Sequence, residues 1–208
     1  MARGNTPQRI LAASLTMFNE EGVAEVSTNH IADEVDISPG NLYYHFRNKE
    51  QIIERLFDDF EAKFYDTLTV PNETPDIEQI WLFLHLMFEL INEYRFIYQD
   101  LVFLVSRQRS LARRFRRIIG RKVEAGMAIC RLLTADGIMQ VSHADEIDTL
   151  AQQIAMTATF WLSFAHVRSE KPDPSATARS VAQVLMLVAP HLIDPARDHL
   201  LALAREYR

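Results

Sequence analysis

Apolar side chains recur at helical spacing along almost the whole chain, and no segment of strand length alternates between apolar and polar residues. The pattern first appears after Thr6, which is expected to cap a helix with Pro7 as its first residue. The buried stripe of this helix comprises Ile10, Ser14, Met17 and Phe18. The helix is expected to stop at Gly22, and the chain as a whole is predicted to be all-α.

Capping residues mark two short helices after Gly22. Ser27 or Thr28 is expected to begin a second helix with the sequence "NHIADEV". Ser38 as the capping residue and Pro39 at the first helical position open a third, which should end near Phe46.

A fourth helix is expected behind the capping residue Asn48 and should run from Lys49 to about Thr69. The motif "PNETP" (71–75) then interrupts the pattern, because two prolines four residues apart cannot lie inside one helix. Further helices are expected at about 76–93, 95–105, 109–135, 145–168, 175–189 and 195–206. We therefore expect an N-terminal domain at 1–50 and a second domain at 51–208, linked through the helix at 49–69.

The third helix has two chemically different sides. On a helical wheel, its inner side carries Leu42 and Phe46, while Tyr43 lies on the flank. Its outer side carries Asn41, Tyr44 and His45. Amide, phenol and imidazole groups suit the reading of base edges, and two short helices joined by a tight turn are typical of a helix-turn-helix.

The stretch "VSTNHIADEVDISPGNLYYHFRNKEQII" resembles the DNA-binding signature of the TetR family of bacterial regulators. The shared features are Phe-x-x-x-Gly at the end of the first helix, Ile-Ala in the second, Ser-Pro-Gly, Leu-Tyr-x-His-Phe, and the Lys-Glu that opens the fourth. The resemblance covers about residues 6–57, and the spacing holds throughout. Val35-Asp36 replaces the Ala-Gly usual in the family's turn, but aspartate tolerates the left-handed conformation better than most residues, so the turn should survive.

The resemblance implies roles for individual residues. Phosphate contacts are implied for Thr28, Tyr43 and Lys49. Base-edge or close backbone contacts are implied for Asn29, Pro39, Gly40, Asn41, Tyr44 and His45. Two alternatives stay open: the large side chains of the third helix could cover a core, and Tyr43 could pack rather than contact a phosphate.

The charge of the chain argues against a polyanionic partner. The net charge is −6, and the first fifty residues hold four basic side chains against seven acidic ones. Acids that face away from a duplex cost little, because the screening length is ~8 Å at physiological salt. A DNA-binding function therefore requires Asp33, Glu34 and Asp36 to face away.

Other features indicate a cytoplasmic protein. The single cysteine, Cys130, excludes an intramolecular disulfide framework, and the N-terminus lacks the apolar run of a signal peptide. The most apolar stretch, 80–91, is too short to span a membrane and includes His85 and Glu89. We expect no membrane association.

The TetR resemblance also implies a homodimer whose two recognition helices enter successive major grooves, about 34 Å apart, on a pseudo-palindromic operator. The helices at 151–167 and 176–190 have broad apolar faces, so we expect them to pair as a four-helix dimer bundle. Small or slender residues in the first of them are Ala155, Ala158, Thr159 and Leu162. The alternative is that both helices are internal.

The middle helices of the family enclose a ligand pocket. The candidate lining residues are Trp81, His85, Met87, Phe88, Phe103, Trp161, Phe164 and His166. Any one of them, at helical spacing, is more often a core residue, but together they suit a small apolar or amphipathic ligand.

A basic helix stands apart from the family signature. Residues 107–122, "RQRSLARRFRRIIGRK", contain eight basic side chains and no acid. Its arginine face comprises Arg109, Arg113, Arg114, Arg116, Arg117 and Arg121. Three interpretations stay open: a solvated surface, a site near the DNA backbone, or a contact with an acidic group of the ligand.

The most consistent hypothesis is a ligand-responsive transcriptional repressor that binds DNA as a dimer and is released by an apolar small molecule. The alternative is a lipid-binding or scaffolding protein whose DNA-binding module is vestigial. No catalytic motif, phosphate-binding glycine loop or metal-ligand cluster is present in the sequence, so we expect no enzymatic activity, cofactor or metal.

Overall fold

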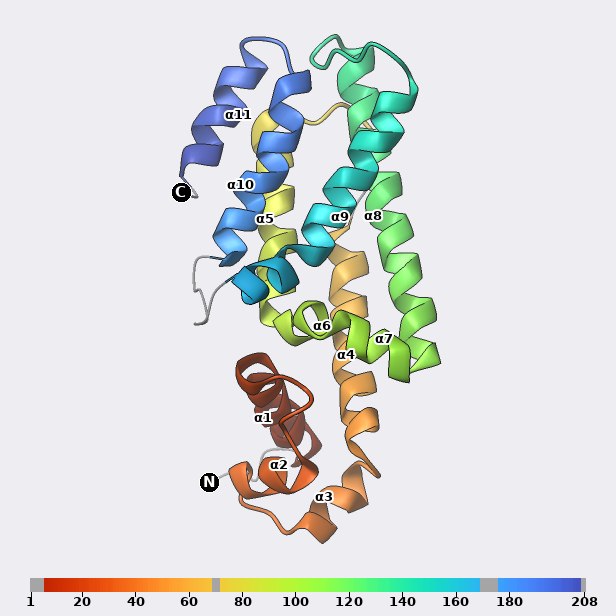
Figure 1. Cartoon of the computed structure of the whole chain (residues 1–208), viewed down its shortest axis with the longest axis vertical. Helices are drawn as coiled ribbons and strands as arrows, with labels where there is room; N and C mark the ends of the chain where they lie inside the picture. Colours follow the sequence, from red (N-terminus) through yellow and green to blue (C-terminus); the bar gives the residue numbers. More distant parts are fainter. Residues whose placement is uncertain (1–5, 69–71, 169–175, 207–208) are drawn as a thin grey trace.

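The computed structural model describes residues 6–68, 72–168 and 176–206, and in these it is all-α (Figure 1). The short helices α1 (Thr6–Glu21), α2 (Thr28–Glu34) and α3 (Pro39–His45) form an N-terminal module at one end of an elongated molecule. The long helix α4 (Lys49–Thr67) runs from this module into the second part of the chain. The expected fold class is therefore confirmed.

The remaining helices form the helical body. They are α5 (Ile77–Glu93), α6 (Arg95–Gln99), α7 (Leu101–Arg107), α8 (Arg109–Ala135), α9 (Asp145–Arg168), α10 (Ala176–Val188), the 3-10 turn η1 (Ala189–His191) and α11 (Ala196–Arg205). Helices α5, α8, α9 and α10 are the main elements of the bundle, and α6 and α7 cross between the bundle and the N-terminal module (Figure 1).

Most element boundaries agree with the sequence to within two residues. The single helix expected at 95–105 is instead divided at Asp100 into α6 and α7. The side chain of Asp100 accepts a hydrogen bond from the backbone N–H of Val23 at 2.8 Å, which is a tertiary contact that local pattern does not reveal. Thr6 is itself helical and is therefore not the cap. Expected features at residue 69, at the start of "PNETP" and in "EKPDPS" (170–175) lie outside the described residues.

Aromatic rings hold α4 against its neighbours. Phe60 lies at the centre, with ring centroids 5.7 Å from Phe57, 6.0 Å from Phe64 and 5.8 Å from Tyr98. Tyr98 in turn lies 5.6 Å from Phe115 of α8. Because all these rings are buried, α4, α6 and α8 share one continuous core.

A set of hydrogen bonds joins the N-terminal module to the helical body. The side chain of Asn19 in α1 donates to the carbonyl oxygen of Glu93 at 2.8 Å and accepts from the N–H of Phe96 at 3.0 Å. The Arg95 guanidinium donates to the carbonyl oxygen of Asn19 at 3.1 Å, and Phe18 lies 5.5 Å from Phe96. We call this the α1–α6 junction. It is a second connection between the two parts of the chain, in addition to α4.

Candidate nucleic-acid interface and ligand cavity

Helix α3 is short, and its ends are fixed by the residues that the sequence indicated. The Oγ of Ser38 accepts a hydrogen bond from the N–H of Asn41 at 3.1 Å, with Pro39 at the first helical position. Phe46 ends the helix in an extended conformation. A helix of this length is not stable alone, so its position depends on its contacts with α2 and on the burial of Leu42.

The two sides of α3 lie as the helical wheel predicted. Leu42 is fully buried and Phe46 is half-buried against the core. Tyr44 is 84% exposed, Asn41 is exposed, and His45 is half-buried with its ring edge-on to Tyr44 at 5.1 Å. The outward face of α3, defined by Asn41, Tyr44 and His45, is therefore open to a partner, and covering a core is excluded for Tyr44.

The turn between α2 and α3 keeps the geometry expected of it. Asp36 has φ 54°, the left-handed conformation predicted at this position. Ile37 donates to the carbonyl oxygen of Ala32 at 3.0 Å, and the Arg9 guanidinium donates to the carbonyl oxygen of Val35. Asp36 therefore adopts the left-handed conformation that the turn was expected to need.

The three residues with implied phosphate contacts differ in what they contact. The hydroxyls of Thr28 and Tyr43 lie 2.9 Å apart, and Tyr43 is 46% exposed. Tyr43 therefore belongs to the surface, and its hydroxyl is held in place by α2. The Lys49 ammonium instead donates to the carbonyl oxygens of Val23 at 2.7 Å and Val26 at 2.8 Å. Lys49 thus stabilises the loop before α2.

The remaining candidate residues at this end of the molecule are accessible. Asn29, Pro39 and Gly40 are all exposed. A Cβ atom added at Gly40 would meet no atom closer than the Oγ of Ser38 at 4.0 Å, and Gly40 has no positive φ. The fold itself therefore does not require glycine at this position.

A mostly apolar cavity of about 80 Å³ lies inside the helical body. Four helices, α5, α8, α9 and α10, line it together with the residue that follows α4. The lining residues are Leu68, Ile80, Phe83, Leu84, Met87, Phe88, Lys122, Ala125, Gly126, Ile129, Cys130, Leu133, Ile154, Ala155, Ala158, Val184 and Val188. Leu68 directly follows α4, so the cavity touches the helix that leads to the N-terminal module.

Of the eight residues predicted to line a ligand pocket, Met87 and Phe88 lie in the lining of this cavity. Trp81 and His85 stack on each other at 5.5 Å on the neighbouring side of α5. The other four also lie outside the lining: Phe103 contacts the Arg107 guanidinium, Trp161 contacts Phe164, and Phe164 and His166 are exposed. Helical spacing identified apolar faces but not which face turns inward.

Lys122 lines the cavity and was not among the predicted residues. It was grouped with the basic stretch 107–122. Its spacing from Leu111, Phe115 and Ile118 nevertheless places it in the middle of the apolar stripe of α8, and the three apolar residues are buried. That register is the signal that separates Lys122 from its arginine neighbours.

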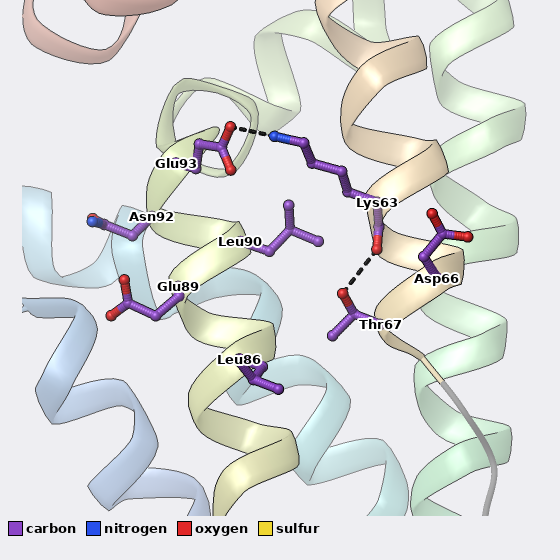
Figure 2. Close-up of a pocket in the computed structure, with 8 residues that line it drawn as sticks. All are labelled: Lys63, Asp66, Thr67, Leu86, Glu89, Leu90, Asn92 and Glu93. Atoms are coloured by element: carbon purple, nitrogen blue, oxygen red, sulfur yellow. Dashed lines mark hydrogen bonds and ion pairs between the residues drawn. The ribbon is translucent and has the colours of Figure 1, made fainter.

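A larger hollow of about 590 Å³ lies on the surface between α4 and α5 (Figure 2). It is open, and Lys63 and Glu93 reach across it to form an ion pair. The Thr67 hydroxyl donates to the carbonyl oxygen of Lys63 at 2.9 Å. Lys63, Glu93 and Thr67 thus already have partners within the chain.

The arginine face of α8 divides into two parts. Arg114 forms ion pairs at 2.7 Å with both Asp58 and Glu61 of α4, and its guanidinium lies 4.7 Å above the ring of Phe57. Burial opposes its charge, but the hydrogen bonds that the guanidinium donates to Glu61 and Asp58, with the negative charges of these groups, outweigh burial and raise the pKa of Arg114 above its ordinary value. Arg114 therefore joins α4 to α8.

The other arginines of this face are exposed. Arg117 lies 3.8 Å from Glu61, and Arg121 pairs with Glu124 at 2.7 Å. Arg109, Arg113 and Arg116 are exposed. The arginine face is thus solvated at its edges and structural at Arg114.

An apolar strip lies on the surface of α9 and α10. It comprises Met156, Phe160, Phe164, Val167 and Met186, all of them exposed. The slender residues that suggested an interface face the other way: Ala155, Thr159 and Leu162 are buried in the chain's own core. The apolar strip, and not the small-residue face, is therefore the surface of α9 that a second copy could cover.

No helix in the described part of the chain is long and apolar enough to cross a membrane.

Comparisons with known proteins agree with the geometry. Residues 10–56 match the model of the N-terminal domain of the bacterial regulatory proteins of the tetR family, and residues 59–200 match the TetR model of a bacterial transcriptional repressor. The solved structure of a TetR-family transcriptional regulator from Marinobacter aquaeolei VT8 is 32% identical, covers 98% of this chain and 99% of its own, and superposes with a TM-score of 0.87.

Two curated relatives are similar over shorter stretches. The transcriptional repressor KstR2 of Mycolicibacterium smegmatis is 35% identical over 71 residues, which cover 31% of this chain and 35% of KstR2. A transcriptional regulator of Staphylococcus aureus strain USA300 is 33% identical over 90 residues, 41% of this chain and 49% of that protein. The matches thus span about a third to a half of these relatives. The two family models and the Marinobacter structure extend over most of the chain, which belongs to the TetR family of bacterial transcriptional regulators, a family of regulators rather than enzymes.

Proposed function

We propose that this chain is a ligand-controlled repressor that binds a pseudo-palindromic DNA operator as a homodimer, reads bases through α3, and leaves the operator when an apolar or amphipathic molecule enters the internal cavity. The observation that carries the proposal is the outward face of α3. Its amide, phenol and imidazole groups lie in the open, while Leu42 anchors the helix to the core.

The residues flanking this face support the same role. Asn29, Pro39 and Gly40 are exposed beside it, and the open space at Gly40 is suited to a close approach of the DNA backbone. The Thr28 and Tyr43 hydroxyls are hydrogen-bonded to each other, so one of them donates within the pair and the other is left to donate to a phosphate. The Lys49 ammonium has two of its three donors engaged by carbonyl oxygens, so we assign it a minor share of phosphate binding.

The dimer follows from the apolar strip on α9 and α10. Val167 is 85% exposed and Phe160, Phe164, Met156 and Met186 accompany it, which is an unfavourable surface for a monomer in water. Pairing two copies through this strip would leave both N-terminal modules free, as binding to two half-sites requires.

Control by a ligand follows from the position of the cavity. It is bounded by Leu68 at the end of α4 and by α5, α8, α9 and α10. A molecule that widens it would displace α4, and Arg114 would carry movement of α8 to the same helix. The ligand must bind the displaced arrangement more tightly than the DNA-bound one to cause release.

Selection of bound duplexes from a random library, at stated salt, tests the proposal. We expect a two-fold symmetric site, and we expect Tyr44→Ala to weaken binding to it by roughly 10-fold or more through loss of base contacts. Tyr65→Ala, which removes an exposed tyrosine from α4, is the matched control and should bind normally. If no sequence is enriched and neither variant changes DNA binding, the module is vestigial and the scaffolding alternative holds.

A further inference from the structure

The least expected charge in the molecule is that of Lys122, which is 8% exposed within the helical body. Its ammonium lies 3.2 Å from the hydroxyl of Tyr98 and 3.4 Å from the Oγ1 of Thr159. It also lies 4.7 Å above the ring of Tyr98. In the part of the chain that the structure describes, no carboxylate pairs with it. Neutral hydroxyls compensate only partly for the removal of an ammonium from water, so this charge lacks a counter-ion.

Lys122 borders the internal cavity, and nearly all the rest of the lining is aliphatic or aromatic. The titratable groups that face the ammonium or share the cavity are Tyr98 and Cys130. Burial raises the pKa of the Tyr98 phenol, and raises that of the Cys130 thiol to about 11, so both are neutral near pH 7. Burial also lowers the pKa of Lys122 to about 7. Among the residues that the structure describes, the surroundings thus offer no anion to this lysine.

The position of Lys122 gives the cavity two different ends. Along α8 the lining runs from Lys122 to Leu133, about three helical turns or roughly 16 Å. The Lys122 end lies beside α6, the helix that carries Tyr98, and the opposite end is apolar. A ligand that satisfies both ends has an anionic head and an apolar body.

We propose that the cavity binds a small amphiphilic carboxylic acid, whose carboxylate pairs with Lys122 and whose apolar part lies against Phe88, Ile129 and Leu133. This assignment rests on the proposed function only in taking the cavity as the regulatory site. It gives the ligand a chemical class, and it gives the otherwise uncompensated ammonium a counter-ion.

The same lysine is connected to the N-terminal module. Tyr98 belongs to α6, whose Phe96 donates its N–H to Asn19. Asp100, at the end of α6, accepts from the N–H of Val23. A carboxylate that draws the ammonium away from Tyr98 therefore acts on the five-residue helix that holds the α1–α6 junction. The carboxylate head group of the ligand, and not only the volume of its apolar part, therefore affects the position of the N-terminal module.

The size of the cavity also bears on the mechanism. About 80 Å³ is below the volume usual for small-molecule sites, so the acid must widen the cavity as it enters. Leu68 is part of the wall, and widening would therefore move the end of α4. Both routes, through α6 and through α4, lead to the N-terminal module.

Calorimetric titration with octanoate, and with 1-octanol as its uncharged counterpart, tests the assignment. We expect octanoate to bind the full-length protein at least 10-fold more tightly than octanol, because its carboxylate pairs with an ammonium that folding has already removed from water. Lys122→Met should abolish this preference. Arg121→Met, which removes an exposed charge from the preceding position of the same helix, should keep it. Because Lys122→Met removes a buried charge, its circular dichroism spectrum is compared with that of the unsubstituted protein to check that the variant is folded.

Proton uptake gives a second readout that a purely structural lysine would not produce. Pairing with the carboxylate stabilises the charged amine, so octanoate binding should take up about 0.9 proton at pH 8 and about 0.1 at pH 6, as expected for a free amine that titrates near pH 7. Titrations in buffers of different ionisation enthalpy measure this number. No uptake is expected for octanol or for Lys122→Met.

Equal affinity for acid and alcohol, or an acid preference that survives in Lys122→Met, would overturn the inference. These outcomes are independent of DNA binding. A protein that binds its selected operator but shows no acid preference refutes only the ligand class. A protein that binds octanoate with the expected proton uptake but enriches no DNA sequence refutes the proposed function and leaves the acid site standing.

Discussion

Asn19 is expected to contribute to stability well beyond its size, because its side chain alone makes two of the hydrogen bonds of the α1–α6 junction. Asn19→Ala removes the 2.8 Å bond to the carbonyl oxygen of Glu93 and the 3.0 Å bond from the N–H of Phe96. Each such bond contributes roughly 0.5–1.5 kcal/mol, and the Phe96 N–H is partly buried, so we expect a loss of about 1–3 kcal/mol in the free energy of unfolding.

Denaturant unfolding at one fixed protein concentration measures this loss, since the stability of a dimer depends on concentration. Amide hydrogen exchange should localise it, with faster exchange at Phe96 and at Val23 than in the α8–α9 core. Asn41→Ala is the matched control: Asn41 is exposed on α3, so this variant should keep its stability and lose operator affinity. If Asn19→Ala unfolds at the same denaturant concentration as the unsubstituted protein, the junction contributes nothing and our account of it is wrong.

Three further predictions concern other parts of the molecule. Burial lowers the pKa of Lys122 to about 7 in the folded protein, below its value in the unfolded chain, so burying the charged amine destabilises the fold fully below pH 7 and less as pH rises. The stability advantage of Lys122→Met over the unsubstituted protein should therefore shrink by about 1.4 kcal/mol per pH unit between pH 7 and 10, as measured by parallel denaturation curves. Asp36→Ala should destabilise by about 1 kcal/mol and Asp36→Gly should not, because φ is positive there; thermal melts of both variants decide this. Phe160→Asp should give a monomer by light scattering, while Val102→Asp, at a more exposed apolar site on α7 (71% against 42%), should leave a dimer; a dimer in both would place the interface elsewhere.

Local signals were sufficient to predict α3 and its surroundings. Ser38 and Asn48 accept hydrogen bonds from Asn41 and Gln51 as capping residues should, and Leu42 anchors the helix. These contacts lie within a few residues along the chain, so periodicity and capping chemistry contain the information. The orientation of the proposed DNA-reading side chains follows directly.

Contacts between distant segments were beyond the reach of the same signals. The division between α6 and α7 depends on Asp100 meeting Val23, and the lining of the cavity depends on which faces of α5 and α9 turn inward. Phe164 and Trp161 have the spacing of core residues but lie towards the surface of α9. Lys122 was readable in principle from its register with Phe115, yet its basic neighbours concealed it.

The exposed strip on α9 and α10 has a consequence for gene dosage. If only paired chains can occupy both halves of an operator, then at low abundance the supply of competent molecules grows with the square of the number of chains. A doubling of synthesis would give about four times as many competent pairs under those conditions. The activity of a regulated promoter would then change more steeply than the concentration of its regulator. The apolar side chains of Phe160 and Val167 would set the dimer dissociation constant, and with it the concentration range in which this steep response occurs.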